Sequence, residues 1–304
     1  MISIIISTYW KRVEMAFKHA NQISQMLNQM VDYEILIIDT SETSHNQTTL
    51  PSNTRYFNLD IRSQNSLAIK RNYGARVAQG EILVFLDDDV LPDLNYFKAV
   101  LSELGKDIVL CGNIFYPKEL VGDNKLIAYK DSRHRSTEKR FSEKYELAYN
   151  NFVAMCFSIF KTSHFNFDEN FSKYGFEDID YGKQLQMRGI KIKLVLNSLA
   201  LHFEESLLLS DYRKKLYCAS RYMFPIFDKK YKYLNPAKKS MVIFLGFFTK
   251  LLHPITDKLF NSCLQRGWLK CVYYYQHVIF LEGYWDYQMG EWFNYKAKQD
   301  NDFI

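Results

Sequence analysis

Three consecutive carboxylates end an apolar segment near the middle of the first half of the chain. The segment EILVFLDDDVLPD, residues 81–93, has the pattern of a buried strand followed by Asp87, Asp88 and Asp89. Like charges this close repel one another, so the arrangement costs stability unless a cation or hydrogen-bond donors collect them. Mg²⁺ and Mn²⁺ prefer carboxylate oxygen and often share one or two protein carboxylates with substrate phosphates. The triplet therefore indicates a cation site, and the alternative is a β-turn, where Asp and Pro are common.

A second acidic group opens an expected helix. Glu177, Asp178 and Asp180 lie in YGFEDIDYG, and the apolar spacing after them predicts a helix that ends at Gly189. Carboxylates are favourable in the first turn of a helix because of its free amides and dipole, which is the structural alternative. The catalytic interpretation is a general base, a carboxylate that takes a proton from a bound hydroxyl in the transition state.

Two further polar features are placed where they could serve the same site. His202 follows the expected strand IKLVLNSLAL at residues 192–201, and imidazole is an acceptable ligand for manganese, although a lone histidine is more often without chemistry. Lys70, Arg71 and Asn72 lie on the expected helix before the triplet's strand. Their cations could neutralise phosphate charge, or they could form an exposed helical face.

An α/β sheet is expected to position these groups. Continuous Ile, Val and Leu runs alternate with amphipathic segments, which indicates β-α-β units and a mostly parallel, buried sheet. Ligands bind at the carboxyl ends of strands in such sheets, where Thr8, Asp39 and the acidic triplet all fall. The expected strands are 2–8, 33–39, 81–87 and 152–160, and the expected helices in the first part are 13–27 and 65–79.

Composition limits the class of protein. A chain of 304 residues with 47% hydrophobic residues can form one domain with an appendage. A net charge of +5, from 39 basic and 34 acidic residues, does not favour a nucleic-acid partner. Five scattered cysteines without a C-x-x-C pair predict reduced thiols and no zinc site.

The same sequence predicts a cytoplasmic protein. The amino terminus MISIIISTYWKR has the pattern of a first strand and lacks the features of a signal peptide. The longest uncharged apolar run, residues 241–248, falls short of the roughly 20 residues that cross a bilayer. No membrane span is therefore expected.

Four segments, in this order, resemble the signatures of family 2 glycosyltransferases with the GT-A fold. They are SIIISTYWKR, ILIIDTSETS, SLAIKRNYGARVAQGEILVFLDDDV, and FDENFSKYGFEDIDYGKQLQMRGIKI with the later LALHF. The last also resembles the galactosyltransferase-like carboxy-terminal segment of several bacterial sugar polymerases. The resemblance covers about two thirds of the chain and implies an inverting, metal-dependent transferase that uses a nucleotide diphosphate sugar.

The resemblance also implies roles for individual residues. The positions that would bind the nucleotide part of the donor are Thr8, Tyr9, Arg12, Asp39, Lys70, Arg71, Asn72, Asp87 and Asp88. The positions that would bind Mn²⁺ or Mg²⁺ are Asp89, Asp87 and His202. Asp178 becomes the catalytic base, and Glu177 and Asp180 would help to hold the acceptor.

Two departures from the family pattern concern the nucleobase. The chain has TYWKR where the family usually has T-x-N-R, and it has DTSE, with Asp39 alone, where two acids are common. Thr40 or Ser41 could replace the second acid as a hydrogen-bond partner. A UDP-sugar is the favoured donor and a TDP-sugar the second, with a hexosyl or N-acetylhexosaminyl group transferred to a glycan or lipid-linked saccharide of a bacterial surface polysaccharide.

Two other classes of function are alternatives to the transferase. Nucleotidyl transfer would call for a Gly-rich phosphate loop after the first strand, and STYWKR contains no glycine. A non-catalytic nucleotide- or glycan-binding module could keep the same fold, because fold does not determine function. Turnover of a nucleotide sugar distinguishes this module from the enzyme.

The composition changes at about residue 206. Lys, Tyr, Phe and Leu then dominate in helical patterns, so we expect a catalytic domain at 1–205 and a helical extension at 206–304. Basic residues interleaved with aromatic ones fit peripheral binding at the inner face of the cell membrane. The alternative is packing within the chain or in a homo-oligomer. The charged stretch 130–146 is expected to be a mobile loop or an exposed helix.

Overall fold

The chain forms two compact units, each described by itself. The computed structural model describes residues 1–9, 12–41, 50–59, 66–141, 146–204 and 208–293. The first unit, here called the sheet unit, comprises Met1–Ser172 and Glu177–Ser206. The second, here called the helical unit, comprises Lys173–Phe176 and Leu207–Ile304.

One mixed sheet forms the centre of the sheet unit. Its strand order, within the described residues, is β3-β2-β1-β4-β7-β6-β8-β5. The pairs β1–β2, β1–β4, β2–β3 and β6–β8 are parallel, whereas β7 runs antiparallel to β4 and β6, and β5 antiparallel to β8. The strands are β1 (Ile2–Thr8), β2 (Tyr33–Asp39), β3 (Thr54–Asn58), β4 (Ile82–Asp87), β5 (Val90–Pro92), β6 (Ile108–Phe115), β7 (Cys156–Phe160) and β8 (Lys191–His202). The predicted α/β class with a mostly parallel sheet is confirmed.

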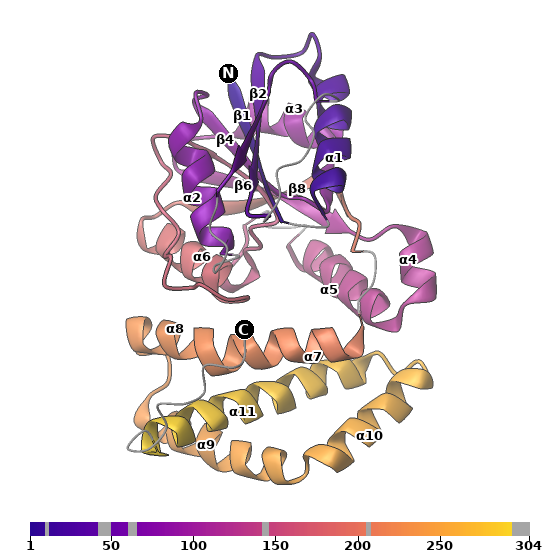
Figure 1. Ribbon diagram of the computed structural model, residues 1–304, viewed down its shortest axis with the longest axis vertical. Helices are drawn as coiled ribbons and strands as arrows, with labels where there is room; N and C mark the ends of the chain where they lie inside the picture. Colours follow the sequence, from indigo (N-terminus) through magenta and orange to yellow (C-terminus); the bar gives the residue numbers. More distant parts are fainter. Residues whose placement is uncertain (10–11, 42–49, 60–65, 142–145, 205–207, 294–304) are drawn as a thin grey trace. The chain divides into compact units, whose positions relative to one another are not determined.

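Helices cover both faces of this sheet. One face is packed by α1 (Val13–Leu27) and α3 (Leu94–Glu103), the other by α2 (Leu67–Val77) and α6 (Glu177–Met187) (Figure 1). Every residue of β1 is therefore buried, which explains its uninterrupted Ile-rich sequence. Three more described helices belong to the unit: α4 (Lys118–Asp123), α5 (Lys125–Phe141) and a 3₁₀ turn at Tyr149–Asn151.

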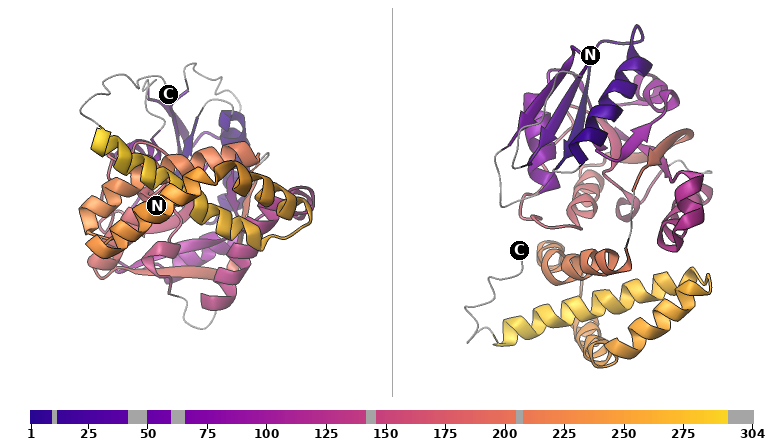
Figure 2. Two further views of the ribbon diagram at one scale, coloured as in Figure 1. Left: turned by 90° about the horizontal axis from the view of Figure 1, so that it is seen from below. Right: turned by 45° about the vertical axis from the view of Figure 1, so that its right-hand side comes forward.

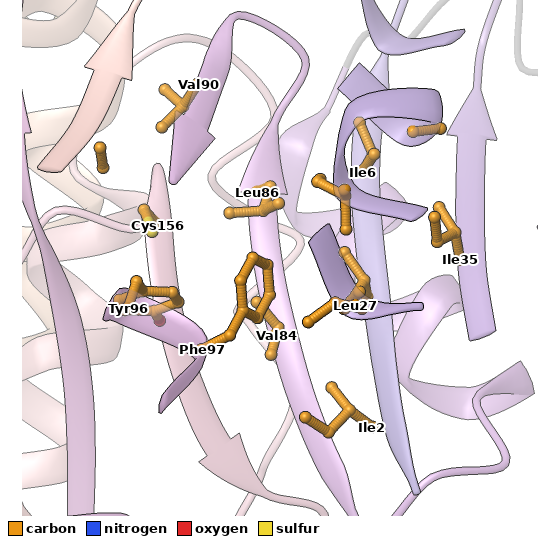
Figure 3. Close-up of a cluster of buried hydrophobic side chains, with 14 of the residues drawn as sticks. Ile2, Ile6, Leu27, Ile35, Val84, Leu86, Val90, Tyr96, Phe97 and Cys156 are labelled. Carbon is orange, nitrogen blue, oxygen red and sulfur yellow. The ribbon is translucent and has the colours of Figure 1, made fainter. Parts of the chain in front are cut away.

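The larger core cluster holds the parallel strands in register. Ile4 of β1 lies between Ile35 of β2 and Val84 of β4. Figure 3 shows side chains of β1, β2 and β4 gathered with Tyr96 and Phe97 of α3. This packing fixes where each parallel strand ends, and with it the positions of the polar residues that follow.

Helix α2 lies so close to β1 that one of its positions admits no side chain. A Cβ added at Gly74 would overlap the Ile5 side chain, whereas one added at Gly122 of α4 would meet nothing. We expect Gly74→Ala to lower the free energy of unfolding by about 1–3 kcal/mol through overpacking. Gly122→Ala should leave it unchanged or raise it by up to about 1 kcal/mol. Urea unfolding of both variants checks this, and equal stabilities would contradict the close packing.

The structure differs from the sequence-based expectations in several elements. Strands β3, β5 and β6 were not predicted, and β7 begins at Cys156, later than the expected 152. The charged stretch 130–146 is helical through Phe141, and Asp131 is buried there, so α5 is not simply exposed. Residues 142–145 of that stretch lie outside the described residues.

The helical unit consists of helices packed around a long central one. Helix α11 (Lys270–Phe293) has α7 (Leu209–Cys218) and α8 (Phe224–Tyr231) on one side and α9 (Pro236–Leu251) and α10 (His253–Gln265) on the other, as Figures 1 and 2 show. A π-helical turn, Ala219–Met223, joins α7 to α8. The helical character predicted after residue 206 is confirmed. None of the helices in the described ranges is both long and apolar enough to cross a membrane.

Candidate active site

The carboxyl ends of the parallel strands bring the polar residues together. Thr8 ends β1 opposite Asp39 of β2, and Ser7 pairs with Asp87 at the end of β4. The short strand β5 runs antiparallel to β8 and pairs Val90 with His202, which brings the histidine next to Asp89. The predicted convergence on one sheet edge is confirmed.

Arg12 is the main counter-ion of the acidic triplet. It lies at the start of α1, directly after β1, and its Nη1 is 2.6 Å from Asp89 Oδ2 and 3.1 Å from Asp88 Oδ1. Thr8 Oγ1 donates to Asp88 Oδ2 at 2.9 Å. These donors offset the repulsion between neighbouring carboxylates.

Arg71 and His202 also contact carboxylates of the triplet, and His202 shares Asp89 Oδ2 with Arg12. Arg71 Nη2 of α2 donates to Asp87 Oδ1 at 2.8 Å, and His202 Nε2 lies 3.2 Å from Asp89 Oδ2. Arg71 Nη1 and His202 Nδ1 are buried and have no hydrogen-bond partner among the described residues. Two polar atoms of the site are thus left for a ligand to satisfy.

The three carboxyl groups differ in proton affinity. Burial raises the pKa of Asp88 to about 7, and the charge of Asp89 adds to this shift. Burial also raises the pKa of Asp87, although Arg71 opposes it. Burial acts in the same direction on Asp89, but contacts with His202 and Arg12 outweigh it and hold the pKa of Asp89 below its usual range. Asp89 is therefore the carboxylate of the triplet that stays ionised most readily.

Asp89 and His202 form a pair of the ligand types that Mn²⁺ and Mg²⁺ accept. The carboxylate and the imidazole lie 3.2 Å apart, and Nδ1 of the imidazole is buried with no hydrogen-bond partner in the described part of the chain. The described side chains include no group of three His, Cys, Asp or Glu residues that could hold a metal ion. Asp87, the expected third ligand, is instead paired with Arg71. The chemistry of the pair fits a cation that also takes oxygen from its substrate.

The basic segment of α2 is buried, so the alternative of an exposed helical face is wrong. Lys70 Nζ donates to the Thr8 carbonyl at 3.0 Å and lies 5.3 Å from the centre of the Tyr9 ring. Burial lowers the pKa of Lys70 to about 8, which still leaves it largely charged at neutral pH. Asn72 exchanges hydrogen bonds with the backbone of Phe167, and therefore anchors the segment that precedes α6.

Helix α6 brings its acidic start to the same site. The charges of Arg71 and Asp87 both act on Glu177 and Asp178, which places the helix start beside the triplet. Burial raises the pKa of Glu177 and of Asp178, and the charge of Asp178 adds to the shift at Glu177. Glu177 Oε2 is buried without a hydrogen-bond partner within the described ranges. Buried carboxyl groups whose pKa is raised by their surroundings are typical of sites of general acid–base chemistry.

Asp180, the third acid of α6, is held by its own helix. It is fully buried, and its Oδ2 accepts a hydrogen bond from Gln184 Nε2 at 2.8 Å. The helix α6 begins at Glu177, and Gly189 adopts a left-handed φ of +72° after it, which confirms the predicted helix stop. The acceptor role of Asp180 stays a prediction.

Two of the residues expected to bind the nucleotide are Tyr9, which follows β1, and Asp39, which ends β2. Tyr9 is exposed, and the Arg12 guanidinium lies 5.9 Å from the centre of the Tyr9 ring. Asp39 is buried, and its carboxylate accepts hydrogen bonds from Ser41 Oγ at 2.6 Å and from Tyr56 hydroxyl at 2.5 Å. Ser41 is thus the partner of Asp39 itself, and the nucleobase contact stays a prediction.

The sequence did not predict the residues that surround His202. The Tyr116 ring lies 4.8 Å from the His202 ring, and its hydroxyl donates to Glu204 at 3.4 Å. Lys130 Nζ of α5 donates to the same glutamate at 2.7 Å. The only available signal was the position of Glu204 two residues after the histidine, in LALHFEE.

The fold and this site define a class of protein, the glycosyltransferases with the GT-A fold. The chain belongs to glycosyl transferase family 2, whose sequence model matches residues 3–165. The matched range contains β1, α2 and β4, and with them the acidic triplet and the basic segment. No curated protein matches the chain in sequence.

Solved structures resemble the chain in fold at low sequence identity. A mannosyltransferase from Pyrobaculum calidifontis, in complex with GDP-Man and Mn²⁺, is 12% identical, with 97% of this chain and 88% of that chain covered and a TM-score of 0.58. S. aureus TarS 1–349 is 13% identical, with 98% of this chain and 93% of that chain covered and a TM-score of 0.46. A Drosophila beta-1,4-galactosyltransferase 7 mutant, in complex with manganese, UDP-Gal and xylobiose, is 15% identical. The match covers 70% of this chain and 74% of that chain, with a TM-score of 0.43. The likeness to the mannosyltransferase, at 12% identity and a TM-score of 0.58, concerns the fold.

Proposed function

We propose that the chain transfers a sugar from a nucleotide diphosphate sugar to a hydroxyl group of a saccharide acceptor, with inversion at the anomeric carbon. The observation that carries the proposal is the collection of Arg71, Arg12 and His202 around the acidic triplet, with the Glu177–Asp178 pair beside them. Family membership supplies the reaction class, and this arrangement supplies groups for each part of the reaction.

The cationic side chains of the site suit a departing diphosphate. Arg71 is buried, its Nη1 has no partner in the described part of the chain, and Lys70 is fixed 3.0 Å from the Thr8 carbonyl. Buried guanidinium and ammonium groups stabilise negative charge better than exposed ones because the local dielectric is low. We assign both to the leaving group, whose charge increases as its bond to the sugar breaks.

The pair of acids at the start of α6 suits the acceptor side. Asp178 takes the proton from the acceptor hydroxyl as the oxygen forms a bond to the anomeric carbon. The bond from that carbon to the diphosphate oxygen breaks at the same time, and its electron pair leaves with the diphosphate. A single displacement inverts the configuration, so an α-linked donor gives a β-glycoside. Glu177 holds the acceptor and competes with Asp178 for the role of base.

A divalent cation, Mn²⁺ or Mg²⁺, is proposed to join Asp89 and His202 to the donor. Bound there, it would supply Lewis-acid stabilisation of the diphosphate. Asp89 suits this position because its pKa is low and it remains ionised. Arg12 contacts the same oxygen at 2.6 Å, so the guanidinium and the cation would compete for Asp89.

The donor and the acceptor are proposed from the resemblance of the sequence to the family. A UDP-sugar is proposed first and a TDP-sugar second, with Thr8, Tyr9 and Asp39 at the nucleotide. The transferred group is a hexosyl or N-acetylhexosaminyl unit, and the acceptor is a glycan or lipid-linked saccharide of a bacterial surface polysaccharide. Residues 1–205 would carry this activity in the cytoplasm, and 206–304 would serve a membrane surface or a second subunit.

Turnover of nucleotide sugars tests the proposal. The purified chain is incubated with single donors, Mn²⁺ and a panel of saccharide acceptors, and nucleoside diphosphate release and product mass are measured. The account predicts release that depends on the acceptor and stops in excess EDTA. Binding of a donor with no release under any of these conditions would favour a non-catalytic module.

A further inference from the structure

The outer side of α9 and α10 carries a row of exposed apolar side chains. Within α9, Met241, Phe244, Phe248 and Leu251 recur at intervals of three or four residues, and Ile255 continues the row in α10. Phe244 is 62% exposed and Leu251 65%. Residues spaced in this way lie along one face of a helix. We call this row, together with Leu252 and Leu259, the apolar face.

The opposite side of α9 packs inside the helical unit, which fixes the direction of the apolar face. Gly246 is buried, and a Cβ there would lie 2.6 Å from both the Leu281 carbonyl oxygen and the Trp285 Cβ of α11. On a helix, Phe244 and Phe248 lie about half a turn away from Gly246. Figure 2 shows α9 and α10 as the outer layer of the unit, on one side of α11. The apolar face therefore points away from the packed interior of the unit.

Basic side chains flank the apolar face. Residues 236–270 contain six Lys or Arg residues and a single acid, Asp257. That acid lies 3.2 Å from Arg213 of α7, so it contributes little negative charge to the surface. Lys238 and Lys258 are exposed at the two ends of the row, and Trp268 is exposed after α10. Such a surface suits a bilayer, with lysines at the headgroups and the Trp and Phe side chains below them.

From this surface we infer that the chain binds anionic lipid membranes through α9 and α10, with the apolar face inserted among the acyl chains and the lysines at the headgroups. A second copy of the chain is a weaker candidate because two such surfaces, each with six basic residues and a single acid, would repel each other. The inference deepens the role proposed for residues 206–304, because it selects the membrane over a second subunit and names the helices that bind it. It requires neither donor nor acceptor.

The test is flotation of the full chain with phospholipid vesicles, without any nucleotide sugar. Vesicles of phosphatidylcholine alone are compared with vesicles that also contain phosphatidylglycerol, at low and high salt. We expect binding to the anionic vesicles at low salt and weaker binding at high salt, because the Debye length falls from about 10 Å at 0.1 M to about 3 Å at 1 M. Absence of binding to anionic vesicles at low salt would overturn the inference.

Matched variants show whether vesicle binding depends on the apolar face or on exposed apolar residues in general. Phe244→Ser/Leu251→Ser should lower binding at least about tenfold, because each buried apolar side chain contributes roughly 1.5–3 kcal/mol. Leu101→Ser/Leu199→Ser removes two exposed leucines of the sheet unit and should leave binding unchanged. Equal losses in both double variants would contradict the assignment.

Charge is tested in the same way. Lys238→Glu/Lys258→Glu should lower binding to anionic vesicles about tenfold or more, since each basic residue near the surface contributes about 1 kcal/mol. Lys98→Glu/Lys106→Glu, which changes the net charge equally on the sheet unit, should bind as the unaltered chain does.

Two further readouts keep the test decisive. Far-ultraviolet circular dichroism shows whether each variant keeps its helices, and sedimentation reports the oligomeric state. A serine variant that becomes monomeric from a dimer, while vesicle binding is absent throughout, would assign the face to a second copy and overturn the membrane inference. Asp89→Asn should still float with anionic vesicles even if it transfers no sugar, so failure of the membrane inference and failure of the proposed function give different results.

Discussion

Asp178→Asn is expected to bind the donor as the unaltered chain does and to lower the transfer rate by about 10²-fold or more. The amide has the shape of the carboxylate but cannot accept the proton of the acceptor hydroxyl. The Asp178 Oδ1 contact with the Ile179 amide, at 2.8 Å, can be kept by the oxygen of the asparagine side chain, so the start of α6 should persist. Single-turnover transfer and donor binding by calorimetry measure the two effects separately.

The pH dependence of transfer provides a second check of this base. Burial raises the pKa of Asp178, and the base acts in its ionised form, so the rate should fall as the pH falls through that raised value. The acid limb should therefore lie above the ordinary aspartate value of about 3.9. Glu177→Gln is the matched comparison at the neighbouring carboxyl. A transfer rate that drops less than about fivefold in Asp178→Asn and about 10²-fold in Glu177→Gln would move the role of base to Glu177.

Asp89→Asn is the second substitution with a large expected effect. It should abolish the dependence of donor binding on Mn²⁺ and lower transfer by about 10²-fold or more, because the removed carboxylate is the one proposed to hold the cation beside His202. The fold should be retained, since Arg12 keeps its contact with Asp88 at 3.1 Å. Transfer assays over a manganese titration and with excess EDTA measure the loss.

Asp93→Asn serves as the control from the same acidic stretch. Asp93 Oδ1 accepts a hydrogen bond from the Tyr96 amide at the start of α3, and asparagine caps helices about as well. This variant should keep both transfer and metal dependence. If Asp89→Asn retained full, manganese-dependent transfer, the cation would have to bind elsewhere.

Strand ends were the part of the site that the sequence could predict. The Ile-rich segment 2–8 and the segment ending at Asp87 are buried on both faces, so their apolar runs stop where the site begins. Parallel pairing then placed Thr8, Asp39 and the triplet at one edge. The helix at Glu177 was predictable because Gly189 ends it in the left-handed region. Local pattern therefore predicted which residues gather at this edge of the sheet, and their roles stay predictions.

The contacts within the site depend on long-range geometry that no local pattern contains. Arg12 was assigned to the nucleotide, yet it pairs with Asp88 and Asp89, 76 and 77 residues away in sequence. Lys130 reaches Glu204 from α5, a helix whose charged sequence suggested only a surface segment. The pairing of β6 with β8 joins residues more than 80 positions apart in sequence, which no local pattern contains. Such pairings are set by packing and appear only in the folded chain.

The most direct measurement of the central claim is the anomeric configuration of the transferred sugar, read by proton nuclear magnetic resonance from the first turnovers. The account predicts a new glycoside whose configuration is opposite to that of the donor, formed with stoichiometric release of nucleoside diphosphate and only in the presence of Mn²⁺ or Mg²⁺. A product that retains the donor's configuration, or donor binding without any new glycoside across the acceptor panel, would contradict the single displacement assigned to Asp178.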